Sequence, residues 1–341
     1  MTCRTIILGE TGIETTALGF GSANLFRLPS AAQRAQILHA AYDAGVRHFD
    51  VAPMYGLGLA EAEIGRFAHR RRDMVTIATK FGIAPSRLTR YVGRGQRPVR
   101  RILEALPTIR NQARKKAAGP QSGLAGRLLY SAEGYCPAAA KKSLERSLHA
   151  LSTEYIDLFL LHDPLPGSVR SEDVRCYLED ARSSGLIRSW GLAGEPASCL
   201  QVAGDFADGI AVLQVRDDIW LRSARDVPAD VGGLITYGIL GDALARLVRS
   251  LSADPRERAR WTRSTGEDCG NPETVASLLL AVALRENYSG IVLFSTIQPQ
   301  RIRRAVDAAH ISLTSSSEAL DAVLSLTEIH SDDSSGKGPT R

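Results

Sequence analysis

Eight short apolar runs alternate with helix-like segments along most of this 341-residue chain. Alternation of this kind is typical of a parallel sheet, because a connection between parallel strands needs about a dozen residues and usually forms a helix. The predicted strands span residues 18–22, 48–51, 74–79, 155–161, 187–192, 210–215, 233–237 and 290–294. Apolar residues at helical spacing predict helices over 31–44, 60–68, 137–151, 171–183, 197–206, 243–251, 272–285 and 299–309.

Eight strands favour a closed (β/α)₈ TIM barrel. A doubly wound sheet, which needs only about five or six strands, is the alternative. Ahead of the first strand, the turn at residues 10–12 between two extended runs predicts an N-terminal β-hairpin. Residues 224–231 are predicted to be weakly helical, and residues 254–268 charged and irregular. We therefore predict a single barrel domain over residues 1–328.

Two segments do not follow the strand and helix rhythm. Residues 84–127 hold eleven Lys or Arg and a single acid, Glu104, so they predict an inserted basic loop after the third strand. A solvated loop is one interpretation of this segment, and a cap over an acidic or bulky substrate is the other. Residues 329–341 have the polar composition of a disordered tail.

Composition restricts the class of function. The net charge of +5, from 42 basic and 37 acidic residues, suits an anionic cofactor but is too small to indicate nucleic acid. The five cysteines show no metal-ligand spacing and no disulfide pattern, which favours a reducing, cytoplasmic location without a metal site. Neither a signal peptide nor an uncharged apolar run long enough for a membrane span is present, so no membrane partner is expected.

Polar side chains stand at the ends of three predicted strands. Asp50 ends the second strand, Lys80 follows the third and His162 follows the fourth, while Tyr55 lies in the loop after Asp50. In a barrel these strand ends meet on one face, where active sites lie. Separately, each residue has an ordinary structural explanation as a cap, a packing residue or a solvated strand end. Together they could supply the proton donor and the polar stabilisation that carbonyl reduction requires.

These residues stand in segments that resemble the aldo-keto reductase superfamily. The matching segments are residues 19–22, 44–56, 78–82, 143–148 and 155–162, and the resemblance extends over residues 5–325. It implies a (β/α)₈ barrel and metal-free, NADPH-dependent carbonyl chemistry on a small-molecule carbonyl or alcohol. It also implies that Tyr55 is the general acid, that Lys80 lowers the pKa of Tyr55 with Asp50 as its partner, and that His162 orients the carbonyl.

The resemblance further implies cofactor contacts in the carboxyl-terminal half. Gln214 matches a glutamine that binds the nicotinamide carboxamide, and Tyr237 matches an aromatic residue that stacks on the nicotinamide ring. Either could equally be a plain barrel residue. Where the family commonly has Ser-Asn after the fifth strand, this chain has Ala193-Gly194.

Residues 294–304 resemble the segment that binds the adenosine phosphate of NADPH. Amides and hydroxyls at a helix N-terminus suit a phosphate, which points to Ser295, Thr296 and Gln298. Arg301 or Arg304 would pair with the 2′-phosphate. A solvated basic helix face is the alternative interpretation, and Ala305 stands where the family has Asn.

We therefore predict an NADPH-dependent oxidoreductase that reduces an aldehyde or ketone, or oxidises a sugar-like alcohol. The alternatives are a nucleotide-binding regulatory or catalytically weak barrel subunit, and a barrel that carries out another reaction, such as isomerisation, without nicotinamide. No metal, nucleic-acid or membrane partner is expected. The sequence leaves open the physiological substrate, the direction of reaction, the choice between NADPH and NADH, and the oligomeric state.

Overall fold

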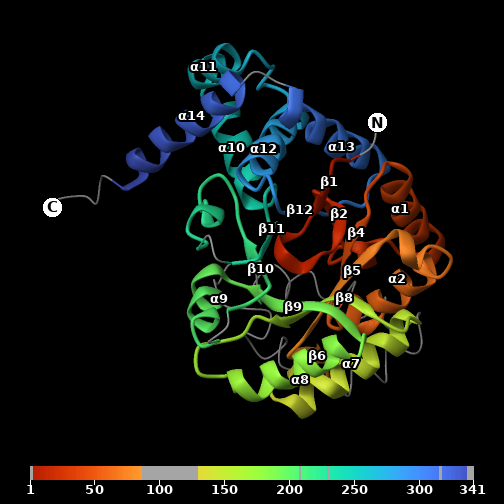
Figure 1. Cartoon of the computed structure of the whole chain (residues 1–341). Helices are drawn as coiled ribbons and strands as arrows, with labels where there is room; N and C mark the ends of the chain where they lie inside the picture. Colours follow the sequence, from red (N-terminus) through yellow and green to blue (C-terminus); the bar gives the residue numbers. More distant parts are fainter. Residues whose placement is uncertain (1–2, 87–129, 207–208, 229–230, 315–316, 336–341) are drawn as a thin grey trace.

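A closed barrel of parallel strands forms the centre of the molecule (Figure 1). The computed structural model describes residues 3–86, 130–206, 209–228, 231–314 and 317–335. In chain order the barrel strands are β3 (Leu18–Gly21), β4 (His48–Asp50), β5 (Thr76–Phe81), β8 (Ile156–His162), β9 (Ile187–Gly194), β10 (Val212–Arg216), β11 (Gly233–Tyr237) and β12 (Ile291–Phe294). Pairing of β12 with β3 joins the last strand to the first. The barrel prediction is confirmed, and the doubly wound alternative is wrong.

Helices surround these strands, as predicted (Figure 1). They include α1 (Ala31–Asp43), α2 (Ala60–Ala68), α7 (Pro137–Leu151), α8 (Ser171–Ser183), α9 (Pro196–Ala203), α10 (Asp242–Ala253), α12 (Pro272–Glu286) and α13 (Pro299–Thr314). Local signals fix their starts: Ser30 caps α1 in a reciprocal bond with Gln33, and Asn271 caps α12 ahead of Pro272. Across the described residues, no helix is both long and apolar enough to cross a membrane.

Residues 254–268, expected to be irregular, contain the helix α11 (Pro255–Thr265). The Asp254 carboxylate accepts hydrogen bonds from the amides of Arg256 and Glu257, and Pro255 occupies the first turn. Trp261 is fully buried, so one apolar contact anchors an otherwise charged helix. The high charge concealed this pattern in the sequence. Of the weak helix expected over 224–231, the described residues 224–228 and 231 contain only part of the 3₁₀ turn η5 (Ser223–Arg225), and residues 229–230 lie outside the described part.

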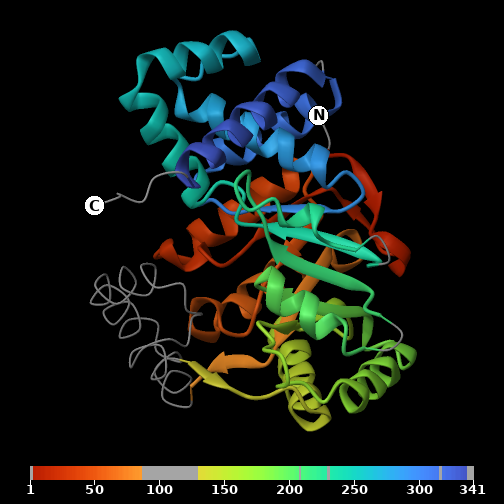
Figure 2. The same ribbon diagram turned by 90° about the vertical axis from the view of Figure 1, so that its left-hand side faces the viewer.

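The chain continues as the helix α14 (Ser317–Ser335), so residues 329–335 are helical where a disordered tail was expected. Leu320, Val323 and Leu326 are buried in a second apolar cluster shared with α10, α11 and α12. Once such an anchor has formed the first turns, adding further residues to a helix costs little free energy. Figure 2 shows these carboxyl-terminal helices grouped at one side of the barrel. Residues 336–341 lie outside the described part of the chain.

The predicted hairpin pairs β1 (Thr5–Ile7) with β2 (Glu14–Thr16) across the 3₁₀ turn η1 (Gly9–Thr11). It lies against the amino-terminal end of the barrel, where a Cβ on Gly9 would stand 1.7 Å from the carbonyl oxygen of Gly232. A hydrogen bond of 2.6 Å joins the hydroxyls of Thr15 and Thr76, which connects the hairpin to β5. The hairpin closes the face opposite the one predicted to carry the chemistry.

The start of the predicted basic loop is a strand. Residues Ile83–Pro85 form β6, which pairs antiparallel with β7 (Tyr130–Ala132). Ile83 is buried in a small cluster with Ala52 and Met54. This packing holds the residues after Gly82 in an extended conformation. The loop prediction is therefore wrong at residues 84–85, while residues 87–129, with most of the basic side chains, lie outside the described residues.

A buried histidine inside the barrel is expected to make folding sensitive to acid. Burial lowers the pKa of His48 to about 3, with a further contribution from Lys80. His48 Nδ1 lies 3.0 Å from Thr76 Oγ1, and its Nε2 has no hydrogen-bond partner among the described residues. An unfolded histidine binds a proton near pH 6.5, so the unfolded state binds more protons than the folded state between about pH 6.5 and pH 3.

The stabilisation from neutral His48 is thus complete above about pH 6.5 and is lost as the pH falls toward 3. For His48 alone, the free energy of unfolding should fall by about 2 kcal/mol between pH 6.5 and pH 5. In urea unfolding at these two pH values, the free energy of unfolding of His48→Gln should fall by about 2 kcal/mol less than that of the parent. His149→Gln, at an exposed position, is the matched control. An unchanged pH dependence in His48→Gln would contradict this account.

Candidate active site

Asp50 and Lys80 form a buried ion pair at the carboxyl end of the barrel. Lys80 Nζ donates to Asp50 Oδ2 at 2.6 Å and to the carbonyl oxygen of Val51 at 3.1 Å. Gln214 Nε2, on β10, donates to the same Asp50 oxygen at 3.1 Å. Lys80 and Asp50 are only 2 % and 3 % exposed. Burying either charge alone would cost much free energy, and pairing offsets part of that cost.

Tyr55 reaches the same place through a sharply turned loop after β4. It begins the 3₁₀ turn η3 (Tyr55–Gly58), in which Gly56 and Leu57 both have positive φ. A Cβ on Gly56 would stand 2.3 Å from the ring of Phe26, so glycine is needed there on two grounds. The loop brings the Tyr55 ring to 5.3 Å from Lys80 Nζ and to 6.2 Å, edge to face, from the imidazole of His162.

His162 ends β8 and presents a neutral imidazole. Burial and, to a smaller extent, the charge of Lys80 together lower its pKa to about 3. The ring Nδ1 has no hydrogen-bond partner among the described residues, and Nε2 lies 4.0 Å from Asp163 Oδ2. A neutral imidazole can donate one hydrogen bond to an oxygen without bringing a charge. The four residues predicted from the strand ends thus lie together, from β4, η3, β5 and β8.

The resemblance implies that Lys80 lowers the pKa of Tyr55, while the surroundings of Tyr55 as a whole raise it. Burial raises the pKa of Tyr55 well above its ordinary value, and the carboxylates of Asp50 and Asp163 raise it further. Lys80 is paired with Asp50 at 2.6 Å. Tyr55 therefore holds its proton across the physiological pH range, as a proton donor must.

Two of the residues assigned to the nicotinamide face the same site. Gln214 donates to Asp50, and its Oε1 is buried with no hydrogen-bond partner among the described residues. A buried orphan acceptor of this kind suits a carboxamide N–H. Tyr237 is half-buried at the end of β11, where burial raises its pKa and the charges of Asp163 and Glu195 raise it further. The Gln214 side chain therefore fits a nicotinamide carboxamide, and Tyr237 lies near the same site.

The residues assigned to the adenosine phosphate lie around the N-terminus of α13, apart from the ion pair. Ser295 and Gln298 are exposed and Thr296 is half-buried. Thr296 Oγ1 accepts from the Gln298 amide at 3.1 Å. Arg301 is exposed. Arg304 instead forms an ion pair with Glu273 of α12, so Arg301 is the better placed of the two arginines to receive a phosphate.

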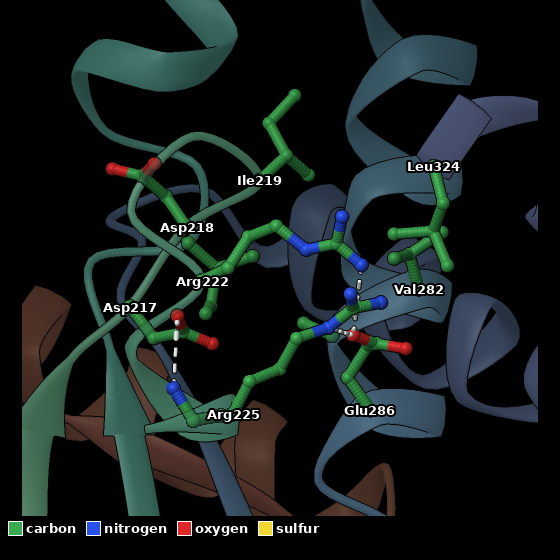
Figure 3. Close-up of a pocket in the computed structure, with 11 residues that line it drawn as sticks. Asp217, Asp218, Ile219, Arg222, Arg225, Val282, Glu286 and Leu324 are labelled. Carbon is green, nitrogen blue, oxygen red and sulfur yellow. Dashed lines mark hydrogen bonds and ion pairs between the residues drawn. The ribbon is translucent and has the colours of Figure 1, made fainter. Parts of the chain in front are cut away.

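A pocket elsewhere on the barrel involves none of these residues. It lies between the connection after β10, the end of α12 and α14, and it is lined by Asp217, Asp218, Ile219, Arg222, Ala224, Arg225, Ile239, Val282, Ala283, Glu286 and Leu324 (Figure 3). The Glu286 carboxylate faces Arg222 and Arg225 at 3.5 and 2.8 Å.

No group of three or more metal-ligating side chains occurs in the part of the chain that the structure describes.

Sequence reasoning missed Asp163 and Tyr135. The Tyr135 hydroxyl donates to the carbonyl oxygen of His162, and the Asp163 amide donates to the carbonyl oxygen of Ala193 at 2.6 Å. These bonds fix the peptide that links His162 to Asp163. The Asp163-Pro164 pair after a strand was a turn signal, because aspartate tolerates positive φ, and Asp163 has φ +49°.

Comparison with known proteins agrees with this geometry. A model of the aldo/keto reductase family matches residues 17–323. The D-threo-aldose 1-dehydrogenase of a Pseudomonas species is 30% identical over 208 residues, which cover 58% of this chain and only 55% of that enzyme. Pyridoxal 4-dehydrogenase of Microbacterium luteolum is 27% identical over 328 residues, covering 88% of this chain and 91% of that enzyme.

Solved structures share the fold. Glycerol dehydrogenase from Gluconobacter oxydans superimposes with a TM-score of 0.68 at 18% identity, over 100% of this chain and 99% of that one. An aldo-keto reductase from Klebsiella pneumoniae, solved in complex with NADPH, gives a TM-score of 0.61 at 22% identity, over 100% and 98% of the two chains. The family model spans most of the barrel, and the chain therefore belongs to the aldo/keto reductase family of oxidoreductases.

Proposed function

We propose that this protein interconverts a small carbonyl compound and the corresponding alcohol, with NADPH as the cofactor. The observation that carries the proposal is the buried Lys80–Asp50 pair, which lies beside a proton-holding Tyr55 and a neutral His162. When bound, NADPH would supply the hydride for the reduction, and NADP⁺ would accept it in the reverse direction. The support for this cofactor is the buried orphan Oε1 of Gln214 and the NADPH complex of the Klebsiella pneumoniae neighbour.

Each side chain has a distinct proposed task. Tyr55 gives its proton to the oxygen of the carbonyl as negative charge develops on that oxygen. Lys80, 5.3 Å from the Tyr55 ring, stabilises the phenolate that remains, and Asp50 holds Lys80 in position. His162 donates a hydrogen bond that orients the carbonyl oxygen without adding a competing charge. Tyr55 carries its proton at neutral pH, as the reduction requires, and the same residues serve the reverse reaction in reverse order.

The cofactor would lie across the carboxyl end of the barrel. Gln214 and Tyr237 would hold the nicotinamide, and Ser295, Thr296 and Gln298 would receive the adenosine phosphate near the N-terminus of α13. The two curated relatives described above are named for an aldose and for pyridoxal, which are small, polar carbonyl compounds that carry hydroxyl groups. We propose a substrate of this polar, hydroxylated class.

Binding of NADPH is the first test of this function. Titration of the protein's intrinsic fluorescence with NADPH should show saturable quenching. Arg301→Ala should weaken NADPH by about 10-fold, the cost of losing a charge-assisted hydrogen bond, while NADH affinity stays unchanged. Arg303→Ala, at an exposed position on the same helix, is the matched control.

A panel of aldehydes and ketones with NADPH then tests turnover. NADPH binding without any turnover would favour a regulatory, nucleotide-binding barrel. A complete lack of NADPH and NADH binding would contradict the proposed function and favour a reaction that uses no nicotinamide.

A further inference from the structure

Asp163 stands in the candidate active site without a role in the chemistry described above. It follows His162 directly, and its Oδ2 lies 4.0 Å from His162 Nε2, the more open nitrogen of that ring. Its charge raises the pKa of both Tyr55 and Tyr237, so the carboxylate lies near both of these residues. Its side chain keeps 31 % of its surface exposed, so it is partly accessible to solvent.

The surrounding structure holds this carboxylate in place at some cost. Asp163 has φ +49°, a conformation that residues other than glycine adopt uncommonly, although aspartate tolerates it better than most. The peptide before it is fixed on both sides, by Tyr135 at the carbonyl of His162 and by Ala193 at the Asp163 amide. Unfavourable backbone conformations that neighbours enforce in this way are concentrated at ligand-binding sites.

The neighbouring strand β9 leaves room for the Asp163 carboxylate. Gly194 ends β9, and a Cβ there would stand 2.6 Å from Asp163 Oδ1, closer than nonbonded atoms approach. Any larger residue at position 194 would push the carboxylate out of its place. No side chain among the described residues donates a hydrogen bond to this carboxylate, so its oxygens can accept from a ligand.

We propose that Asp163 accepts a hydrogen bond from a hydroxyl on the carbon next to the substrate carbonyl, and so selects α-hydroxy carbonyl compounds and the corresponding vicinal diols. This inference rests on the proposed function, because it takes the carbonyl oxygen to lie at His162 Nε2. An oxygen on the adjacent carbon then lies on the side of Asp163 Oδ2, since the two groups are 4.0 Å apart. A carboxylate only accepts hydrogen bonds, so it recognises a hydroxyl and gains nothing from a methyl group.

Two variants test the carboxylate without unfolding the loop. Asp163→Gly deletes the side chain at a positive φ, where glycine is unstrained. Asp163→Asn keeps the size of the side chain, tolerates the same φ and removes the charge. The measurement is kcat/KM with NADPH for 2-hydroxypropanal, for 3-hydroxypropanal and for propanal, each corrected for hydration of the aldehyde.

We expect the parent protein to prefer 2-hydroxypropanal over propanal. In Asp163→Gly that preference should fall by about 10-fold, the low end for a hydrogen bond to a charged group, because the site is partly exposed to water. In Asp163→Asn the preference should lie between those of the parent and of Asp163→Gly, since the amide oxygen can still accept a hydrogen bond. The readout is the ratio of kcat/KM for 2-hydroxypropanal to kcat/KM for propanal, because loss of the Asp163 charge also acts on Tyr55 and so changes activity on every aldehyde. Moving the hydroxyl to 3-hydroxypropanal should remove the preference.

Two results would overturn the assignment. An equal loss on all three aldehydes would make Asp163 a support for His162 instead of a substrate contact, and an unchanged preference in both variants would remove it from recognition altogether. Failure of the proposed function looks different. In that case the parent protein would turn over none of the aldehydes and would not oxidise propane-1,2-diol, and the inference would fall with it.

Discussion

Tyr55→Phe should lower kcat/KM for carbonyl reduction by about 10²- to 10⁴-fold, the range contributed by a positioned general acid. The substitution removes only the hydroxyl that would give the proton. The ring keeps its packing against Ala52, Met54 and Ile83, so the fold should be unaffected. Affinity for NADPH should be close to that of the parent, because the proposed cofactor contacts lie on other strands.

Steady-state kinetics and fluorescence titration of the same preparation separate these two effects. Tyr288→Phe, which deletes the same hydroxyl from an exposed tyrosine, is the matched control and should match the parent in both measurements. If Tyr55→Phe retained more than about a tenth of the parent activity, another group would have to be the proton donor.

The buried ion pair should give the largest effect on stability. Lys80→Met would leave the Asp50 carboxylate 3 % exposed, with Gln214 as its remaining hydrogen-bond donor. An uncompensated buried charge of this kind costs about 3–5 kcal/mol of unfolding free energy. Urea unfolding at pH 7 measures this loss. Activity should fall as well, because Lys80 is the cation nearest to the Tyr55 ring.

The double variant Asp50→Asn/Lys80→Met separates stability from chemistry. With both charges removed, most of the lost stability should return, since neutral groups of similar size are cheaper to bury. Activity should stay low, because the positive charge beside Tyr55 is still missing. Arg170→Met, which breaks an exposed pair with Asp173, should change stability by no more than about 0.5 kcal/mol. If Lys80→Met changed the free energy of unfolding by no more than this control does, the Lys80–Asp50 pair would have only a minor structural role.

The sequence predicted the parts of the site that depend on strand order. Asp50 and His162 end their strands and Lys80 stands one residue before the end of β5, so closure of the barrel brings them to one face. Tyr55 follows from a fixed number of loop residues after Asp50. The proposed catalytic residues could therefore be named from local patterns and the resemblance alone.

Other features depended on residues far apart in the chain. The pKa of Tyr55 rises because of burial and, after it, the charges of Asp50 and Asp163. Gln214 bonds to Asp50 across 164 positions of sequence. The helix α11 forms on a buried Trp261 inside a segment that looks charged and irregular. Arg304, one of two equivalent candidates in the sequence, is paired with Glu273 of another helix.

By itself, then, the sequence determined the barrel and the strand ends that carry the four proposed catalytic residues, because hydrophobic period and element order are properties of neighbouring residues. Only the tertiary structure decided which charges face one another and how deeply each is buried. Coulomb energies and desolvation depend on distances between segments, and those are set when the barrel closes. Asp163 illustrates the difference: its carboxylate gained a candidate role only when Gly194, Tyr135 and Ala193 were found around it.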